Sequence, residues 1–353
     1  MANNNNVKVK QVADNVFEIS VDDHSYRMAL PHWETDYIQG RLANTHEPYE
    51  LEMLRAMAAV LKPGELVLDV GANIGNHSMY LAVVAECRVC AFEPNLELSR
   101  AFNESVMLND LGGLITVHPE GVGVGPTMAH FANHMPDNLG GQSLTVDGSE
   151  ESDITVIALD SLVLKDKVRA IKIDVEGMEQ EVLEGARQLI SRDKPNLFIE
   201  AQTESDFELL HEVVVELGYV YWDTFNATPT HWFIHKDELG ENAIIDHYFE
   251  KGRDSYKLRL AMREVQKRLN EANEKYRNAN ERIDELKGKL NAANEKYKSL
   301  TAQSLSVRDQ LKAENEKLRG ELRTCESRLQ SENPSSGKWA GGFDFSVDGT
   351  EIG

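Results

Sequence analysis

Residues of the right type and spacing to bind a nucleotide cofactor occur in segment 66–80, which reads LVLDVGANIGNHSMY. An apolar strand ends at Asp69, a turn contains Gly71 and Gly75, and a helix follows. Glycine is needed where a chain turns sharply or where its backbone has to contact a ligand, and a helix N-terminus offers free N–H groups. The segment is therefore typical of a nucleotide-cofactor loop, although such loops serve several cofactors.

The glycine spacing separates two cofactors. A dinucleotide loop has the pattern G-x-G-x-x-G, which lets a pyrophosphate lie on the helix end. Here Asn73 and Asn76 stand at the second and third glycine positions. The pattern G-x-N-x-G, with Asp69 two residues earlier, suits a ligand without a pyrophosphate. S-adenosylmethionine has no pyrophosphate. Its cationic sulfonium and its amino acid group are drawn to carboxylates rather than to phosphate-binding amides. An NAD-dependent oxidoreductase is the alternative.

Glu93 marks the tip of the second predicted strand, in the sequence CAFEPN, 22 residues after Gly71. A carboxylate at this place in a doubly wound sheet can accept hydrogen bonds from both ribose hydroxyls of a cofactor. NAD and S-adenosylmethionine both carry that ribose. Glu93 therefore supports the site without distinguishing the two cofactors.

Carboxylates crowd the end of another apolar strand, in the segment 172–185, KIDVEGMEQEVLEG. Asp174, Glu176 and Glu179 could orient an acceptor hydroxyl, act as a general base or hold a hard divalent cation, although we assign no metal ligand. The alternative is structural, because Glu176 and Glu179 would also stabilise the first turn of the next helix through its dipole.

Several motifs occur in one order along the chain: DVGANIG, AFEPN, LDSL, KIDVEGMEQEVLEGA and PNLFIE. Together they resemble the FkbM family of S-adenosylmethionine-dependent methyltransferases over about residues 45–235. The resemblance implies a class I methyltransferase fold, an α/β Rossmann-like fold with a doubly wound, mostly parallel seven-stranded sheet. It also implies S-adenosylmethionine as cofactor and, typically, O-methylation of a hydroxyl on a sugar, glycan or secondary metabolite.

The resemblance also assigns residues to the site. Those that it places at the cofactor are Asp69, Gly71, Asn73, Gly75, Glu93 and Asn95. It places Asp174 and Glu176 at the reaction crevice. Asn138 and Gly140 resemble the family's loop before LDSL, and His77 stands where the family often has an aromatic side chain.

A hydroxyl acceptor has to lose a proton during methyl transfer. Asp174 is the first candidate for the base or orienting group, and His118, His134 and Glu200 are further candidates. Positioning of acceptor and methyl group can account for ~7 kcal/mol or more of the barrier.

The elements that must position these residues alternate between residues 64 and 235, which predicts a parallel sheet covered by helices on both faces. Expected strands are 66–70, 88–92, 114–118, 168–174, 196–200, 219–222 and 230–234. Expected helices are 48–61, 75–84, 96–108, 178–190 and 204–217. Because ligands of open α/β sheets bind outside the carboxyl ends of the strands, the glycine loop and the carboxylates should share one crevice. Residues 120–153 interrupt the alternation, and we interpret them as a lid or substrate loop.

The last third of the chain has a different pattern. ANEKY at 272–276 recurs at 293–297, and the offset of 21 residues is three heptads. Apolar residues recur alternately three and four positions apart, which predicts a coiled coil with a partner helix, about 120 Å long. Ser304, Glu314 and Glu321 interrupt this seam. We expect a homo-oligomer, with the number and orientation of its helices left open. A single charged helix that lies in solvent or folds back on the domain is the alternative.

Composition bounds the remaining possibilities. The chain has 353 residues, 59 of them acidic and 37 basic, and the net charge is −26 over residues 1–250 and +4 from Lys251 onward. Such an acidic first part would repel a phosphate backbone, so nucleic acid is a poor first guess for the substrate. No apolar run approaches the ~18 residues that a membrane span needs. No secretory signal is recognisable and three cysteines cannot form a disulfide framework, so a cytoplasmic location is expected.

Four segments follow from these patterns: an N-terminal β-rich segment (1–44), a methyltransferase domain (45–250), a coiled coil (251–331) and a C-terminal tail (332–353). The absence of GxSxG, P-loop and HExxH strings argues against a hydrolase, a kinase or a zinc hydrolase. A catalytically idle domain on a coiled-coil scaffold is a further alternative. The expected partner is a small-molecule or glycan acceptor.

Overall fold

The computed structural model describes residues 11–132, 139–146 and 152–332. His134, Asn138 and most of the predicted tail lie outside these residues. The chain divides into two compact units, residues 1–252 and 253–353. The predicted segment boundaries at residues 44, 250 and 331 stay predictions.

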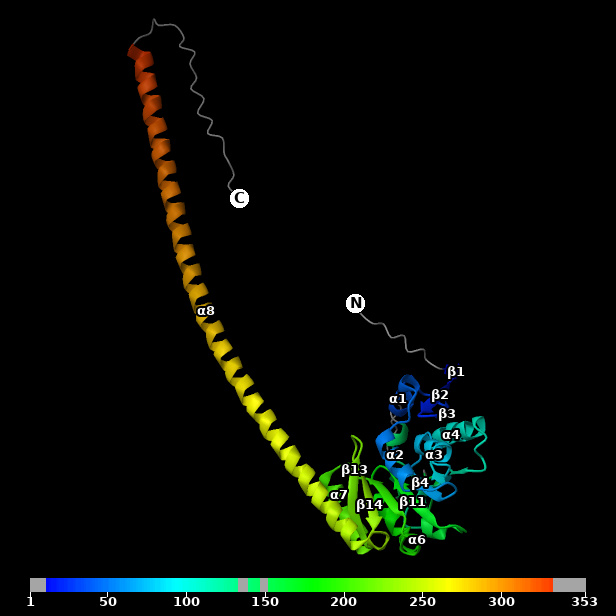
Figure 1. The fold of residues 1–353 in the computed structure, drawn as a ribbon. Coiled ribbons are helices and arrows are strands. Elements are labelled where there is room, and N and C mark those ends of the chain that lie inside the picture. The colour runs from blue at the N-terminus through cyan, green and yellow to red at the C-terminus, as the bar shows by residue number, and fades with distance from the viewer. Residues whose placement is uncertain (1–10, 133–138, 147–151, 333–353) are drawn as a thin grey trace. The chain divides into compact units, whose positions relative to one another are not determined.

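A seven-stranded sheet forms the centre of the first unit (Figure 1). In sheet order its strands are β13 (Tyr219–Phe225), β14 (Thr230–His235), β12 (Asn196–Glu200), β11 (Val168–Ile173), β4 (Leu66–Val70), β5 (Arg88–Phe92) and β6 (Ile115–His118). The strands from β12 to β6 pair in parallel, and β14 runs antiparallel to both β12 and β13. The sheet is therefore mixed but mostly parallel, and all seven predicted strands occur within two or three residues of their predicted bounds.

Helices cover both faces of this sheet. They are α1 (Tyr37–Thr45), α2 (Leu51–Ala59), α3 (Asn76–Val83), α4 (Leu96–Leu108), α5 (Glu179–Glu184), α6 (Arg187–Asp193) and α7 (Glu204–Glu216). Strand β4 is buried along its whole length because its side chains alternate between two hydrophobic clusters. Val67 packs with residues of α1 to α4, and Leu66, Leu68 and Val70 pack with residues of α5 to α7. The fold is thus doubly wound, as predicted.

The order of the strands places a switch point between β4 and β11. From β4 the chain proceeds to β5 and β6 on one side, and from β11 it proceeds to β12 on the other. In open α/β sheets a crevice forms where the order reverses, outside the carboxyl ends of the strands. Gly71 directly follows β4 and Asp174 directly follows β11, so both lie at this point.

The single helix predicted over 178–190 is wrong, because the structure breaks it into α5 and α6. A Cβ on Gly185 would lie 1.9 Å from the backbone oxygen of Gly123, so the chain approaches another segment too closely for a regular helix with side chains. The carboxylate of Asp160 accepts hydrogen bonds from the N–H groups of Gln188 and Leu189, which caps the start of α6. Both causes are tertiary contacts that helix periodicity does not record.

Two smaller sheets flank the central one. In the N-terminal segment, β1 (Gln11–Ala13), β2 (Val16–Val21) and β3 (His24–Ala29) form an antiparallel sheet. The described parts of the predicted lid or substrate loop contain β7 (Gly121–Val122), β8 (Thr127–Phe131) and β9 (Leu144–Thr145), which pair in one sheet with β10 (Ile154–Ile157). The sequence analysis did not predict these short strands, and they give this segment a regular framework.

One continuous helix, α8 (Glu241–Glu332), follows the sheet (Figure 1). It begins about ten residues before the predicted start of the coiled coil. Its first turns pack against β13, where the ring of His247 stacks on Trp222 at 3.8 Å between centroids and Lys251 pairs with Asp223. Among the described residues, no helix combines the length and the apolar character that would let it cross a membrane.

The start of α3 yields a test of the fold. Gly75 has φ of +86°, and a Cβ on it would lie 2.2 Å from the ring of Phe102. Gly64 has a similar φ of +80° but open space around it. Gly64→Ala should cost about 1 kcal/mol through backbone strain, and Gly75→Ala should cost a further ~1–3 kcal/mol through overpacking. Urea unfolding measures both losses, and equal losses would contradict the predicted contact with Phe102.

Candidate active site

The carboxyl ends of β4 and β11 meet through backbone atoms at Gly71. Its φ is +77°, and a Cβ on it would lie 1.7 Å from the backbone oxygen of Asp174. A side chain here would therefore push the two strand ends apart. Gly71 thus has a structural role at the switch point, in addition to the predicted contact with a cofactor.

Lys172 holds the same two strand ends together from inside the sheet. Its side chain is 3% exposed, and its Nζ donates a hydrogen bond of 2.7 Å to the backbone oxygen of Gly71. The same Nζ lies 3.1 Å from Asp174 Oδ2 and 3.6 Å from Asp69 Oδ1. Burial would lower the pKa of Lys172, but the two carboxylates outweigh it and hold the pKa above its ordinary value. Lys172 is therefore a charged group in the core.

The sequence analysis missed Lys172, although a signal was present. A lysine in the middle of an apolar strand is rarely buried unless it is paired, and Asp174 follows two residues later. Asp69 is fully buried, and Ser78 in α3 donates a hydrogen bond of 2.6 Å to its carboxylate. Asp69 therefore positions Lys172 and α3.

Glu93, directly after β5, organises the predicted cofactor loop. Its two carboxylate oxygens accept hydrogen bonds from the backbone N–H of Asn73, at 2.7 Å, and of Asn95, at 2.8 Å. Asn73 has a left-handed φ of +52°, and its side chain accepts the N–H of Ile74 at 2.6 Å. Burial raises the pKa of Glu93 to about 7. The N–H groups of Asn73 and Ile74, which a pyrophosphate would need, are thus already bonded within the protein.

Three predicted site residues have other contacts. Gly75 packs against Phe102. The side chain of Asn95 caps α4 by accepting the N–H groups of Glu97 and Leu98. His118 stacks on Phe92 at 5.0 Å between ring centroids. In the part of the chain that the structure describes, none of these three lines either of the two cavities at the switch point.

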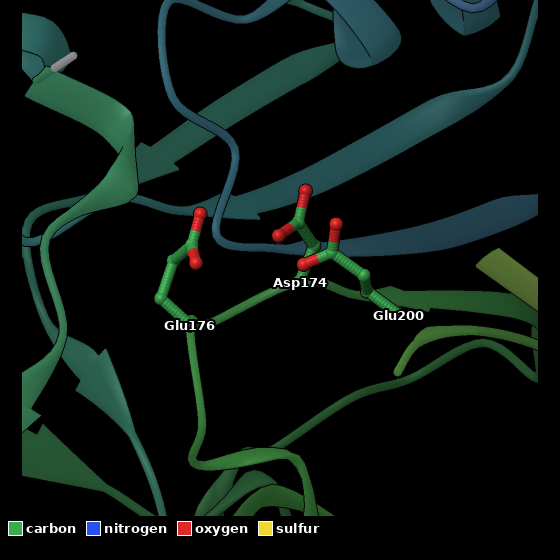
Figure 2. Close-up of side chains that lie close together, drawn as sticks. All are labelled: Asp174, Glu176 and Glu200. Atoms are coloured by element: carbon green, nitrogen blue, oxygen red, sulfur yellow. The ribbon is translucent and has the colours of Figure 1, made fainter. Parts of the chain in front are cut away.

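Asp174, Glu176 and Glu200 come together at the ends of β11 and β12 (Figure 2). Each contributes one carboxylate oxygen to a group whose members all lie within 4.8 Å of one another. Burial and the neighbouring Asp174 raise the pKa of Glu200 to about 9. Burial also opposes ionisation of Asp174, but Lys172 outweighs it and lowers the pKa of Asp174. At pH 7 Glu200 is therefore protonated and Asp174 is ionised. Carboxylate oxygens such as those of Asp174, Glu176 and Glu200 are also the type of ligand that hard divalent cations bind.

The turn after β11 aims Glu176 at this group. Glu176 has φ of +55° and Gly177 has φ of +106°, and Gln202 donates a hydrogen bond of 2.6 Å to the Glu176 carboxylate. Glu179 instead accepts the backbone N–H groups of Val175 and Gly177. Glu179 therefore has the structural role at the start of α5 that the sequence analysis gave as the alternative. Glu176 differs, because its left-handed backbone beside the crevice is a strained conformation of the kind that occurs at functional sites.

Two adjoining cavities lie at the switch point and share Gly71, Glu93, Gly140, Asp174 and Glu176. One, of about 480 Å³, has a mostly apolar lining. Its apolar side chains are Val70, Phe92, Pro94, Val122, Phe131, Leu139, Leu144, Val175 and Met178. Several of these come from the predicted lid or substrate loop, so the described part of that segment does contribute to the crevice.

The other cavity, of about 850 Å³, has a mostly polar lining. Its polar side chains are Tyr37, Tyr49, Glu50, Asn73, Asn76, His77, Glu93, Lys172, Asp174, Glu176, Glu200 and Thr228. His77 Nε2 lies 3.0 Å from Glu50 Oε2, and both side chains are largely buried. Glu50 has a left-handed φ of +60° and reaches His77 instead of capping α2. Sequence reasoning missed this pair because its members are 27 residues apart, and the one available signal was His77 at a position where an aromatic is usual.

Comparison with known families agrees with this arrangement. Residues 69–221 match the family model of the methyltransferase FkbM domain. The matched segment is 153 of the 353 residues, which is less than half of the chain. The match spans the glycine loop, Glu93, Lys172 and the three clustered carboxylates, and it ends before α8.

Solved structures similar to this chain are distant from it. The methyltransferase FkbM from Methylobacillus flagellatus KT is 22% identical, with 58% of this chain and 58% of that chain covered and a TM-score of 0.39. The precorrin-6y C5,15-methyltransferase from Geobacter metallireducens GS-15 is 14% identical, with coverage of 52% and 86% and a TM-score of 0.33. TYW2 from M. jannaschii, in complex with AdoMet, is 14% identical, with coverage of 64% and 86% and a TM-score of 0.35. The comparison with curated proteins gave no match.

The role of the buried Lys172 cation between β4 and β11 can be tested by its removal. Lys172→Met leaves Asp69 and Asp174 without their shared counter-charge, and loss of one partner of a buried ion pair costs ~3–5 kcal/mol. Lys167→Met is the control, because Lys167 is 46% exposed and pairs with Glu238 at 3.6 Å, and such pairs contribute ~0–1 kcal/mol. Chemical denaturation measures both losses. Similar losses would contradict the role of Lys172.

The raised pKa of Glu200 predicts a pH dependence of stability. Between the ordinary pKa of 4.5 and the folded value of about 9, the folded state holds a proton that the unfolded state releases. The stabilising contribution is therefore complete below the ordinary pKa and is lost as the pH rises toward 9. Glu200→Gln should flatten this loss, so that the Tm of the variant falls less than that of the wild type between pH 6 and 9, by ~2–4 °C for each kcal/mol. Glu212→Gln, at an exposed position of α7, should follow the wild type, and parallel curves for Glu200→Gln would contradict the assigned pKa.

Proposed function

We propose that this protein is an S-adenosylmethionine-dependent methyltransferase that O-methylates a hydroxyl group of a sugar, a glycan or a secondary metabolite. The observation that carries the proposal is the chemistry of the crevice at the switch point, which has few free N–H donors and many carboxyl groups. Its loop amides are bonded to Glu93 and Asn73, and its polar cavity is lined by five carboxyl groups and one lysine. Such a site favours a cation over a phosphate.

The two cavities fit the parts of S-adenosylmethionine. The apolar cavity suits a flat purine, and Glu93 lines both cavities at their junction, where its carboxylate can accept ribose hydroxyls. Each Glu93 oxygen accepts one backbone N–H and has a second lone pair for a ligand. Other carboxyl groups that line the crevice, Glu176 among them, provide the negative charge that a sulfonium and an α-amino group require. A dinucleotide would have to place a pyrophosphate among these carboxylates, so the site supports the sulfonium cofactor over NAD.

The polar cavity suits a polyhydroxylated acceptor. Tyrosine, threonine, asparagine and carboxyl groups surround it, and such groups give the hydrogen bonds that orient a sugar. The net charge of −26 over the first 250 residues supports a small-molecule or glycan acceptor, since a nucleic acid backbone would be repelled.

When bound, the cofactor supplies a methyl group on a good leaving group. The protein has to align the acceptor hydroxyl and take its proton. Asp174 is the residue that we propose for this role, because Lys172 keeps it ionised and it lines both cavities. Glu176 lies beside it, and the His77–Glu50 pair lines the same polar cavity, where an imidazole held by a carboxylate can accept a proton. His118 is the weakest of the predicted candidates, because its ring stacks on Phe92.

The experiment that tests the proposal is incubation of the full-length protein with methyl-labelled S-adenosylmethionine and a panel of sugars, glycans and hydroxylated metabolites. The expected result is label in an acid- and base-stable ether of one acceptor class. Label in a nitrogen or carbon product would contradict O-methylation. Label in no product despite tight cofactor binding would favour a catalytically idle domain.

Asp174→Asn should separate turnover from cofactor binding. The variant keeps the size and hydrogen bonds of the side chain but loses the negative charge that orients and deprotonates the acceptor. We expect kcat to fall by ~10²–10⁴-fold, with the Kd for S-adenosylmethionine within a few-fold of the wild-type value. Asp166→Asn is the control, because Asp166 pairs with Arg88 at the surface. Unchanged turnover in Asp174→Asn would remove Asp174 from the mechanism.

A further inference from the structure

Helix α8 carries an apolar stripe along most of its length that no other described residue of the second unit covers. The large apolar side chains at the predicted seam positions are between 47% and 72% exposed. They are Leu258, Met262, Val265, Leu269, Tyr276, Ile283, Leu286, Leu290, Tyr297, Leu300, Val307 and Leu311. A single solvated helix is stabilised by pairs such as Lys289–Glu285 and Arg268–Glu264, at i,i+4, and gains nothing from such a stripe. The stripe therefore points to a partner helix.

The charges beside the stripe restrict that partner. With Met262 and Ile283 at position a and Leu258 and Leu286 at position d, the two flanks of the seam are the g and e positions. The g residues from 268 to 296 are all basic: Arg268, Lys275, Arg282, Lys289 and Lys296. The e residues from 266 to 301 are, apart from Lys287, neutral: Gln266, Asn273, Asn280, Asn294 and Thr301. One flank is a row of cations, and the other is a row of amides and hydroxyls.

This asymmetry distinguishes the two ways in which a second copy of the helix could pack. In an antiparallel pair the g row of one helix faces the g row of the other, so the cations at 268–296 would oppose one another wherever this segment pairs with itself, as Lys289 and Lys296 would in a pair centred on residues 258–329. In a parallel pair each g residue faces the e residue five positions later in the other copy. Arg268 would then face Asn273, and Lys275 would face Asn280. The exception is Arg282, which would face Lys287, a residue that has an intrahelical pair with Asp284 at 3.3 Å.

The C-terminal part of α8 also supports pairing with a second copy in register. A four-residue stutter after Leu311 would continue the seam at Asn315, Leu318, Leu322, Cys325 and Leu329, and insertions of this size are accommodated by local unwinding. The shift moves Glu314 and Glu321, which interrupt the seam in the first register, to the flanking g position. It also places Asn315 at position a. A polar asparagine at a single a position pairs with its counterpart and fixes the register and the number of strands in two-stranded coils.

We propose that α8 pairs with α8 of a second copy of this chain as a parallel, in-register, two-stranded coiled coil over about residues 258–329. The proposal concerns assembly and is independent of the proposed methyl transfer. In this arrangement every d residue lies against the same residue of the other copy. Cys325, which is exposed in the single chain, would then lie opposite its counterpart.

Cysteine cross-linking in the full-length protein tests both orientation and register. Mild oxidation should convert the wild-type protein into a covalent dimer through Cys325, since facing d residues reach the Cα separations that a disulfide requires. Cys87 and Cys90 are buried, and burial raises the pKa of both thiols to about 11, so they should not react. Cys325→Ser should stay uncross-linked.

Two further variants in the Cys325→Ser background decide the orientation. Val265→Cys and Leu286→Cys, both at position d, should each cross-link, whereas Gly288→Cys, on the outer face, should not. An antiparallel pair allows at most one position to meet its own counterpart, so cross-linking at only one of the positions 265, 286 and 325 would overturn the proposal. Light scattering should give twice the chain mass. A monomer mass, or a mass of three or more chains, would also overturn it.

Discussion

The ammonium group of Lys172 is the interaction on which the candidate site depends. It lies in the core between β4 and β11, where it contacts the Gly71 carbonyl and the carboxylates of Asp69 and Asp174. Two carboxylates at neighbouring strand ends would repel each other, and an isolated buried charge is expensive. The cation compensates both costs. It also keeps Asp174 ionised, while Glu200, next to Asp174, holds a proton. The contact that joins the ends of β4 and β11 therefore also sets the charges in the crevice.

Glu93 has a comparable double role at the next strand. By accepting the N–H groups of Asn73 and Asn95, it orders the glycine loop and uses the donor that a phosphate would need. The loop thus resembles a dinucleotide loop in sequence position but differs from it in chemistry. A crevice with an apolar cavity on one side of Glu93 and a carboxylate-rich cavity on the other is suited to a neutral base and a positively charged group. The fold alone would not distinguish these ligands.

Much of the fold follows from local sequence. Strands such as 66–70 and 196–200 are short apolar runs between turn residues, and helix 96–108 begins at an asparagine cap, so their bounds were predicted to the residue. The sequence also predicted those site residues that lie at the ends of strands, such as Glu93 and Asp174. The contacts of Lys172 with Gly71 and Asp69, the His77–Glu50 pair and the break between α5 and α6 could not be predicted, because each depends on side chains or backbone brought together from distant segments. For Lys172 the sequence offered only the signal of a lysine within an apolar strand.

The central claim is that the crevice beside Gly71 and Glu93 is built for a sulfonium-bearing nucleoside. Isothermal titration calorimetry on the folded wild-type protein, with S-adenosylmethionine, S-adenosylhomocysteine and NAD in separate titrations, tests it most directly. The account predicts binding of both adenosyl compounds with one-to-one stoichiometry and no measurable heat from NAD. Binding of NAD together with no heat from either adenosyl compound would contradict it.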